Sequence, residues 1–233
     1  MTDKKIMDQL RNLGDSRQTG FCCYCGKNTE TRDHVPSKVF LDEPYPENLP
    51  VVFACQSCNE GFSLDEEYLA CLIECVVCGT VDYMGVERKK IASIFQRKPA
   101  LVSRFAQARK EVGDGLAFSA ELPRIKNVLL KLARGHAVYE LNEPQLDEPS
   151  CLTCIPLFGM DPGQRVKFEA LPRSLKSPEV GSRSSQRLVV NEPGLVLWMT
   201  VQQGRYRYLA FVDSGIIIRI VIREYLACEI GWD

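Results

Sequence analysis

Apolar residues recur three and four positions apart from Ser63 onward, which is the spacing of one helix face. Ser63 is predicted to cap this helix, with Glu66 three residues later completing a capping box. The apolar positions of the face are Leu64, Tyr68, Leu69, Leu72, Ile73, Val76 and Val77. The pattern therefore predicts an amphipathic helix that begins at residue 63.

Two more helical stretches and a group of strands follow. Residues 86–111 are predicted to be helical with a break before Pro99, because proline disfavours helical geometry in the preceding residue. A further helix is predicted after Pro123, ending near Glu140. Three β-branched and aromatic runs separated by short turns predict an antiparallel meander at Leu195–Gln202, Arg205–Val212 and Gly215–Ile222.

Two segments between these elements have the composition of loops. Residues 142–150 are acidic and proline-broken, which predicts an exposed loop or boundary. Residues 173–187 are rich in Ser, Arg and Lys, and a mobile loop is predicted there.

The composition is that of an ordinary globular protein, with 233 residues, 45% of them hydrophobic and 25% charged. No apolar run approaches the roughly 20 residues of a membrane helix, so no membrane partner is expected. Residues 1–15 lack the apolar stretch of a signal peptide. We therefore expect a cytoplasmic α+β protein.

Positive charge is concentrated in the middle of the chain. The net charge is −1, yet residues 81–140 hold 12 Lys and Arg against 6 Asp and Glu. Such a segment is suited to a phosphate backbone, or it is simply a solvated helix face. The residues considered for nucleic-acid contact are Lys38, Arg88, Lys89, Lys90, Arg97 and Lys98.

The cysteines include two CxxC pairs, Cys22 with Cys25 and Cys55 with Cys58. The chain has eleven cysteines and no export signal, so this spacing predicts tetrahedral structural zinc rather than disulfides. The other cysteines are predicted to be core thiols at Cys71, Cys75, Cys78 and Cys228, whereas metal binding or a redox role stays open for Cys151 and Cys154.

Between the two CxxC pairs lies Asp33-His34, and Asn48 and Asn59 follow. The neutral imidazole of His34 can take a proton from water, since its pKa lies near working pH. Asp33 and Asn59 offer oxygen ligands to Mg²⁺ or Mn²⁺, and Asn48 can hydrogen-bond across the loop to orient the histidine. This set predicts metal-assisted hydrolysis of a phosphodiester.

The order CxxCG, DHxxP, NLP and CxxCN over about residues 20–70 resembles the HNH endonucleases, also called ββα-metal or His-Me finger nucleases. The resemblance implies that His34 is the general base and that Asp33 and Asn59 bind the catalytic metal. It also implies that Asn48 braces the strand and loop, that the four cysteines bind zinc, and that the product carries a 5′ phosphate.

The chain departs from the family pattern at three places. Many members have a lysine where this chain has Phe62, and some have a second metal-binding histidine where it has Ser63. Many also have a glycine-rich stretch where residues 38–41 stand. The expected metal shell is therefore limited to Asp33, Asn59, phosphate and water.

Two further features have structural explanations beside functional ones. His136 lies on the apolar face of its predicted helix and is expected to be a core residue. The alternation in Arg205-Tyr206-Arg207-Tyr208 predicts a strand, with the rings either buried or stacked on bases.

The predicted organisation is an N-terminal tail at residues 1–17, a zinc-bearing HNH module at 18–80, a basic helical segment at 81–140 and an antiparallel β-rich region of unknown role at 141–233. DNA is the expected substrate, with RNA left open. Members that resemble this chain occur in mobile elements and anti-phage defence, some beside an ATPase, so such a protein partner is considered by analogy alone. The alternatives are a non-catalytic zinc module that binds nucleic acid or a protein, and an interaction protein whose C-terminal half contacts another subunit.

Overall fold

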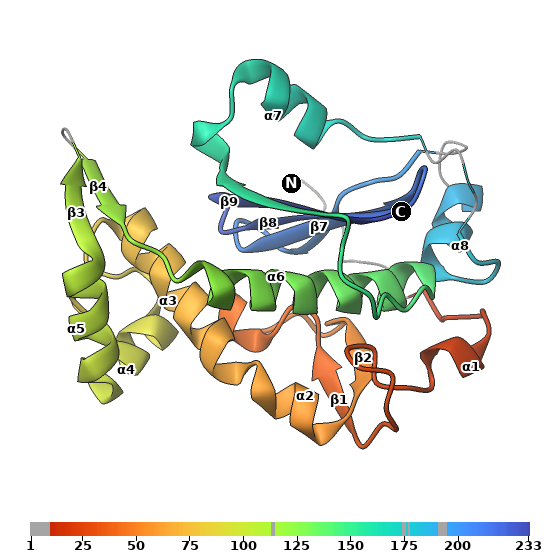
Figure 1. Cartoon of the computed structure of the whole chain (residues 1–233), viewed down its shortest axis with the longest axis horizontal. Helices are drawn as coiled ribbons and strands as arrows, with labels where there is room; N and C mark the ends of the chain where they lie inside the picture. The colour runs from red at the N-terminus through yellow and green to blue at the C-terminus, as the bar shows by residue number, and fades with distance from the viewer. Residues whose placement is uncertain (1–9, 113–114, 174–175, 177, 191–194) are drawn as a thin grey trace. The chain divides into compact units, whose positions relative to one another are not determined.

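The computed structural model describes residues 10–112, 115–173, 176, 178–190 and 195–233 (Figure 1). The chain is divided into two compact units, and one of them combines the residues up to Gly61 with Leu129–Asp233. Phe62–Val128 form the other unit. The division falls inside the predicted 18–80 module and inside the predicted 81–140 segment, so the two CxxC pairs belong to the same unit as the C-terminal half.

The N-terminal part of the first unit consists of short elements. They are the helix α1 (Ser16–Thr19), the strand β1 (Thr31–His34), the 3-10 turn η1 (Lys38–Phe40), the strand β2 (Val51–Ala54) and the helix α2 (Gln56–Gly61). The two strands pair antiparallel, with His34 opposite Val51 and Thr31 opposite Ala54. Because α2 follows β2 directly, the order of elements is β, β, α.

The C-terminal part of the same unit is a five-stranded antiparallel sheet in the order β5-β9-β8-β7-β6. Its strands are β5 (Cys151–Pro156), β6 (Met199–Gln202), β7 (Tyr206–Val212), β8 (Ile216–Ile222) and β9 (Leu226–Trp232). The predicted meander is confirmed for β6, β7 and β8. Sequence reasoning missed β5 and β9; β9 follows a tight turn in which Arg223 and Glu224 have positive φ.

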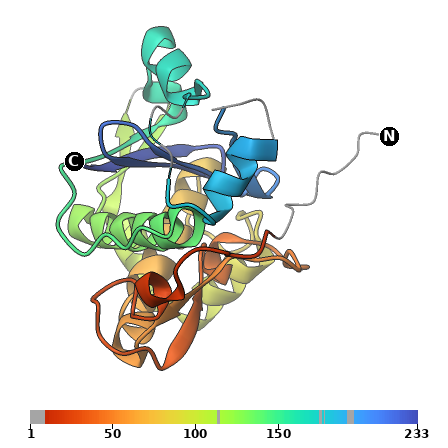
Figure 2. The ribbon, with the colours of Figure 1, turned by 90° about the vertical axis from the view of Figure 1, so that its right-hand side faces the viewer.

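The helix α6 (Leu122–His136) continues into the π-helical turn η2 (Ala137–Leu141). From Leu129 onward this helix lies between the sheet and the β1–β2 pair, a layering that both views show (Figures 1 and 2). His136 is fully buried, its ring stacks on Tyr208 with centroids 3.7 Å apart, and its Nε2 lies 2.8 Å from the hydroxyl of Tyr206. The prediction of a core histidine is confirmed. The alternative prediction, that Tyr206 and Tyr208 stack on bases, is wrong because both rings are buried against this helix.

Between β5 and β6 the described residues form the 3-10 turn η3 (Leu157–Gly159), α7 (Pro162–Glu169) and α8 (Arg183–Val190). A capping box of Asp161 and Gln164 begins α7. The prediction of a loop over residues 173–187 is wrong from Arg183 onward, where α8 begins; residues 174, 175 and 177 lie outside the described residues. Contacts with η2 hold α8, since Arg183 Nη1 donates to the carbonyl of Tyr139 at 2.8 Å.

The second unit contains α3 (Ser63–Cys78), α4 (Lys89–Arg97), α5 (Pro99–Ala108), the paired strands β3 (Arg109–Val112) and β4 (Gly115–Phe118), and the first turns of α6. The rings of Tyr68, Phe95 and Phe105 pack together in its core. The helix predicted from residue 63 and the break before Pro99 are confirmed.

Two local predictions in the second unit are wrong. The N-cap of α3 is Phe62 and not Ser63, and the Phe62 side chain makes no capping bond. The helical pattern predicted to residue 111 ends at Ala108, because the chain turns there into β3. Cys71 and Cys75 are buried as expected, whereas Cys78 is half-buried.

Candidate metal centre and the Asp33-His34 segment

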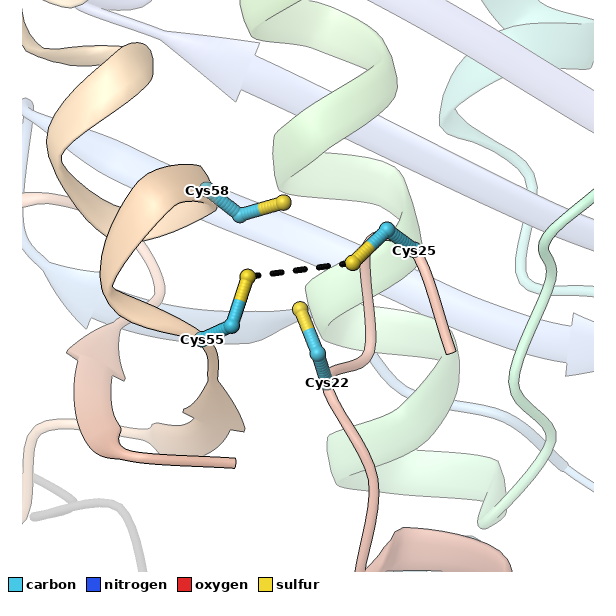
Figure 3. A group of neighbouring side chains, drawn as sticks. All are labelled: Cys22, Cys25, Cys55 and Cys58. Carbon is cyan, nitrogen blue, oxygen red and sulfur yellow. Dashed lines mark hydrogen bonds between the residues drawn. The ribbon is translucent and has the colours of Figure 1, made fainter. Parts of the chain in front are cut away.

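The two CxxC pairs come together at one point (Figure 3). The sulfurs of Cys22, Cys25, Cys55 and Cys58 all lie within 4.8 Å of one another, and those of Cys25 and Cys55 are 3.7 Å apart. None of the four is in a disulfide. Four thiols at this separation could hold a metal ion such as zinc, whose tetrahedral Zn–S bonds are about 2.3 Å long.

Local backbone geometry brings each pair into place. The first pair lies on a tight turn in which the N–H of Gly26 donates to the carbonyl of Cys22 at 2.8 Å. Gly26 has a φ of 73°, which an L side chain rarely adopts. The second pair follows β2 into α2, and the N–H of Cys23 donates to the carbonyl of Phe53 at 3.1 Å. The turn and the strand are thereby joined beside the sulfurs.

The four thiols differ in acidity. Burial raises the pKa of Cys22, but hydrogen bonds with the backbone N–H groups of Cys55, Tyr24 and Cys25 together lower it by a larger amount. The resulting pKa of Cys22 is about 7. Burial raises the pKa of Cys25 and of Cys58. A bound cation reverses this effect because it favours the thiolate. Cys23, which lies between Cys22 and Cys25 in the sequence, is buried, and burial raises its pKa as well.

Asp33 lies on β1 with its side chain inside the protein. The residue is 7% exposed, and its Oδ2 accepts a hydrogen bond of 2.8 Å from the hydroxyl of Tyr24. The same Oδ2 lies 2.8 Å from Nζ of Lys131, a residue of α6 that is 1% exposed. The carboxylate is therefore paired with a buried cation of the protein.

Sequence reasoning missed Lys131. Its sequence signal is the helical stripe to which it belongs, three residues after Val128 and four before Gly135. Val128 is buried, and a Cβ added to Gly135 would lie 2.6 Å from a methyl carbon of Val35. A lysine between two such positions indicates a buried cation that needs a partner.

His34 ends β1 and is half-buried. Its Nδ1 is buried and has no hydrogen-bond partner among the described residues. Burial is the largest effect and lowers the pKa of His34; the charges of Lys38 and Lys131 act in the same direction, against Asp33 and the carbonyl of Pro50. The ring is therefore neutral at neutral pH, the state that can accept a proton.

Asn59 is brought to the same strand. Its Nδ2 donates to Oγ1 of Thr31 at 3.0 Å and to the carbonyl of Arg32 at 3.4 Å. Asn48 is half-buried in the connection between the two strands, three residues before Val51, the partner of His34. The exposed Lys38 lies beside Tyr45, with its Nζ 5.3 Å from the ring centroid.

Asp33 and Asn59 each have one side-chain oxygen that takes no part in the contacts described above. Both hydrogen-bonding contacts of the Asp33 carboxylate described above fall on Oδ2, and those of Asn59 use its nitrogen. The remaining oxygen of each side chain, Oδ1, is of the type that Mg²⁺ prefers. The two side chains therefore differ from the four cysteines, whose sulfurs are the group that lies close enough together to hold a metal among the described residues.

The basic residues predicted to contact nucleic acid lie in the second unit, apart from Lys38. Arg88 is only 5% exposed and its backbone N–H donates to Glu74, so its prediction as a surface phosphate contact is wrong. Lys89 and Arg97 are exposed, Lys90 is half-buried, and Nζ of Lys98 lies 2.7 Å from Glu67.

Comparisons of the chain with models of protein families, with curated proteins and with solved structures gave no match. Among the described residues, no helix has the length and apolar character needed to cross a membrane.

Proposed function

We propose that the chain is a nuclease of the HNH type, which hydrolyses phosphodiester bonds of nucleic acid, DNA in the first instance. The observation that carries the proposal is the arrangement around β1. Two of the four clustered cysteines precede β1 in the sequence, and the other two lie at the start of α2. His34 ends β1, and Asn59 from α2 is hydrogen-bonded to the same strand. A zinc ribbon that served only as a structural support would need neither side chain there.

Each residue has one role in this proposal. Zinc bound by the four cysteines holds the first turn against α2. His34 accepts a proton from the attacking water, and Asn48 supports the loop that presents the histidine. Asp33 and Asn59 hold Mg²⁺ or Mn²⁺, which when bound stabilises negative charge on the phosphate and the leaving oxygen.

A zinc-bearing module that binds nucleic acid or a protein without cleaving it is the second candidate. The ion pair of Asp33 with Lys131 favours this alternative, because a neighbouring ammonium opposes the binding of a second cation.

The test is cleavage of supercoiled plasmid by wild type and by His34→Ala, each with Mg²⁺, Mn²⁺ or EDTA, and with single-stranded RNA in parallel. We expect metal-dependent nicking that falls by about 10²-fold or more in the variant, the usual contribution of a general base. Zinc content and circular dichroism serve as controls, since the substitution should change neither. Equal cleavage by both proteins would refute the proposed role of His34. Binding of DNA without cleavage by the zinc-loaded wild type would refute the proposal that the protein is a nuclease.

A further inference from the structure

Lys131 connects α6 to both sides of the His34 position. Its Nζ donates to Oγ of Ser37 at 2.7 Å and lies 2.8 Å from Oδ2 of Asp33. Asp33 precedes His34 by one residue and Ser37 follows it by three. One buried ammonium thus holds the chain immediately before and after the proposed base.

We propose that Lys131 is a positioning residue for His34, acting through Asp33 and Ser37. The inference rests on the function proposed above, and it extends the catalytic module beyond the region of family resemblance. Lys131 does not touch substrate in this proposal; it fixes the backbone from which the imidazole projects and the direction in which the Asp33 carboxylate points.

The environment of Lys131 supports a fixed geometry. Lysine carries three donors in a tetrahedral arrangement, and two of them are directed at Asp33 and Ser37. Tyr24 also donates to Asp33, and its ring centroid lies 5.8 Å from Nζ of Lys131. A buried ion pair is retained only when its polar atoms find good partners, so each member of this group depends on the others.

The backbone of α6 approaches the same segment closely. A Cβ added to Gly135 would lie 2.6 Å from Val35, the residue after His34. The absence of a side chain at Gly135 therefore lets the helix lie directly on the His34 segment, one turn beyond Lys131. Polar contacts and close packing act on the same five residues of chain.

The first test measures local order and does not depend on activity. Amide hydrogen exchange is compared in wild type, Lys131→Met and Lys126→Met, an exposed lysine of the same helix that provides the same loss of charge. The reporters are the amides of Val35, Phe40 and Leu41, which donate to the carbonyls of Pro50, Ser37 and Lys38, respectively. We expect exchange at these amides to be at least about tenfold faster in Lys131→Met and unchanged in Lys126→Met.

Amides of β8 and β9 serve as internal controls for global stability. If Lys131→Met unfolds the protein, the variant Ser37→Ala is used instead, because this substitution removes only one neutral contact of Lys131. For Ser37→Ala we expect a smaller increase in the exchange rate of the same amides. Unchanged exchange at Val35, Phe40 and Leu41 in a folded Lys131→Met protein would overturn the proposal, as would equal acceleration of the β8 and β9 amides.

The second test separates positioning from substrate contact. We expect kcat of plasmid nicking to fall about tenfold or more in Lys131→Met while KM stays within about twofold, and Lys131→Arg to recover part of the loss. In the Ser37→Ala background, the loss caused by Lys131→Met should be smaller than in wild type. A raised KM with unchanged kcat, or fully additive losses, would overturn the proposal. Failure of the nuclease function itself appears separately, as an inactive wild type in which the exchange effect persists.

Discussion

The two ends of the first unit are stabilised in different ways. In the C-terminal sheet, apolar side chains from adjacent strands are fully or almost fully buried, among them Ile218, Ile220, Val221 and Ile230. In residues 20–61 the strands β1 and β2 have four residues each, and their stability depends on individual contacts. These contacts include the sulfur cluster and the ion pair of Asp33 with Lys131.

This difference shows how a site can be precise without a large core of its own. Buried area stabilises a structure without fixing one side chain, whereas metal bonds and charged hydrogen bonds have defined lengths and directions. The residues of the proposed reaction lie in the region of individual contacts, and the sheet supplies the rigid support behind α6.

The largest expected effect is that of zinc removal. The regular elements of the 20–61 region are short, with four residues in each strand, so loss of the metal should unfold this region and leave the sheet intact. Amide exchange after complete chelation, with metal content confirmed by elemental analysis, measures this. Protection should be lost in residues 22–59 and kept in β8 and β9. Protection unchanged in both regions would show that the two ends are stabilised alike.

The reverse experiment removes apolar area from the sheet. Ile220→Ala should lower the free energy of unfolding by about 2–5 kcal/mol, because Ile220 is fully buried and the cavity left behind collapses only in part. Zinc stoichiometry of the folded protein should remain at the wild-type value. Chemical denaturation with metal analysis tests both, and loss of zinc from the folded variant would contradict the separation of the two regions.

A smaller effect is expected from pH, through the helix between the two regions. Burial lowers the pKa of His136 from 6.5 to about 3, so the unfolded state binds a proton that the folded state does not between these values. Stability from this group is present above pH 6.5 and is lost as pH falls. Between pH 7 and pH 5, wild type should lose about 2 kcal/mol more than His136→Phe. Parallel pH profiles of the two proteins would count against a neutral buried histidine.

The sequence predicted the parts of the site that depend on spacing. CxxC pairs and the Asp33-His34 dipeptide are read directly from the chain, since neighbouring residues determine their geometry. The helix from residue 63 and the strands β6 to β8 were likewise predictable from regular apolar spacing. The Ser63 cap failed because the chain is already helical at Phe62, its N-cap, which leaves Ser63 inside the helix.

Contacts between distant segments could not be predicted in this way. Nothing near residue 131 indicates that its lysine meets Ser37, 94 residues earlier. The strand β9 was missed because its sequence, LACEIGW, has weak alternation and acquires its conformation by pairing with both β5 and β8. The pairing of Asp33 with a buried lysine likewise depends on the fold, because no local sequence motif contains both residues.

The segment that follows His34 is also held by the C-terminal sheet. Gln202 exchanges two hydrogen bonds with the backbone of Asp42, 160 residues away, and Nε of Arg205 lies 2.5 Å from the Asp42 carboxylate. During synthesis on the ribosome, all four cysteines have emerged long before Lys131, Gln202 and Arg205. The loop that carries the four cysteines can therefore close early in translation, whereas the His34 segment receives the contacts of Gln202 and Arg205 only after residue 205 has been made. The order of synthesis therefore separates closure of the cysteine loop from completion of the contacts that surround His34.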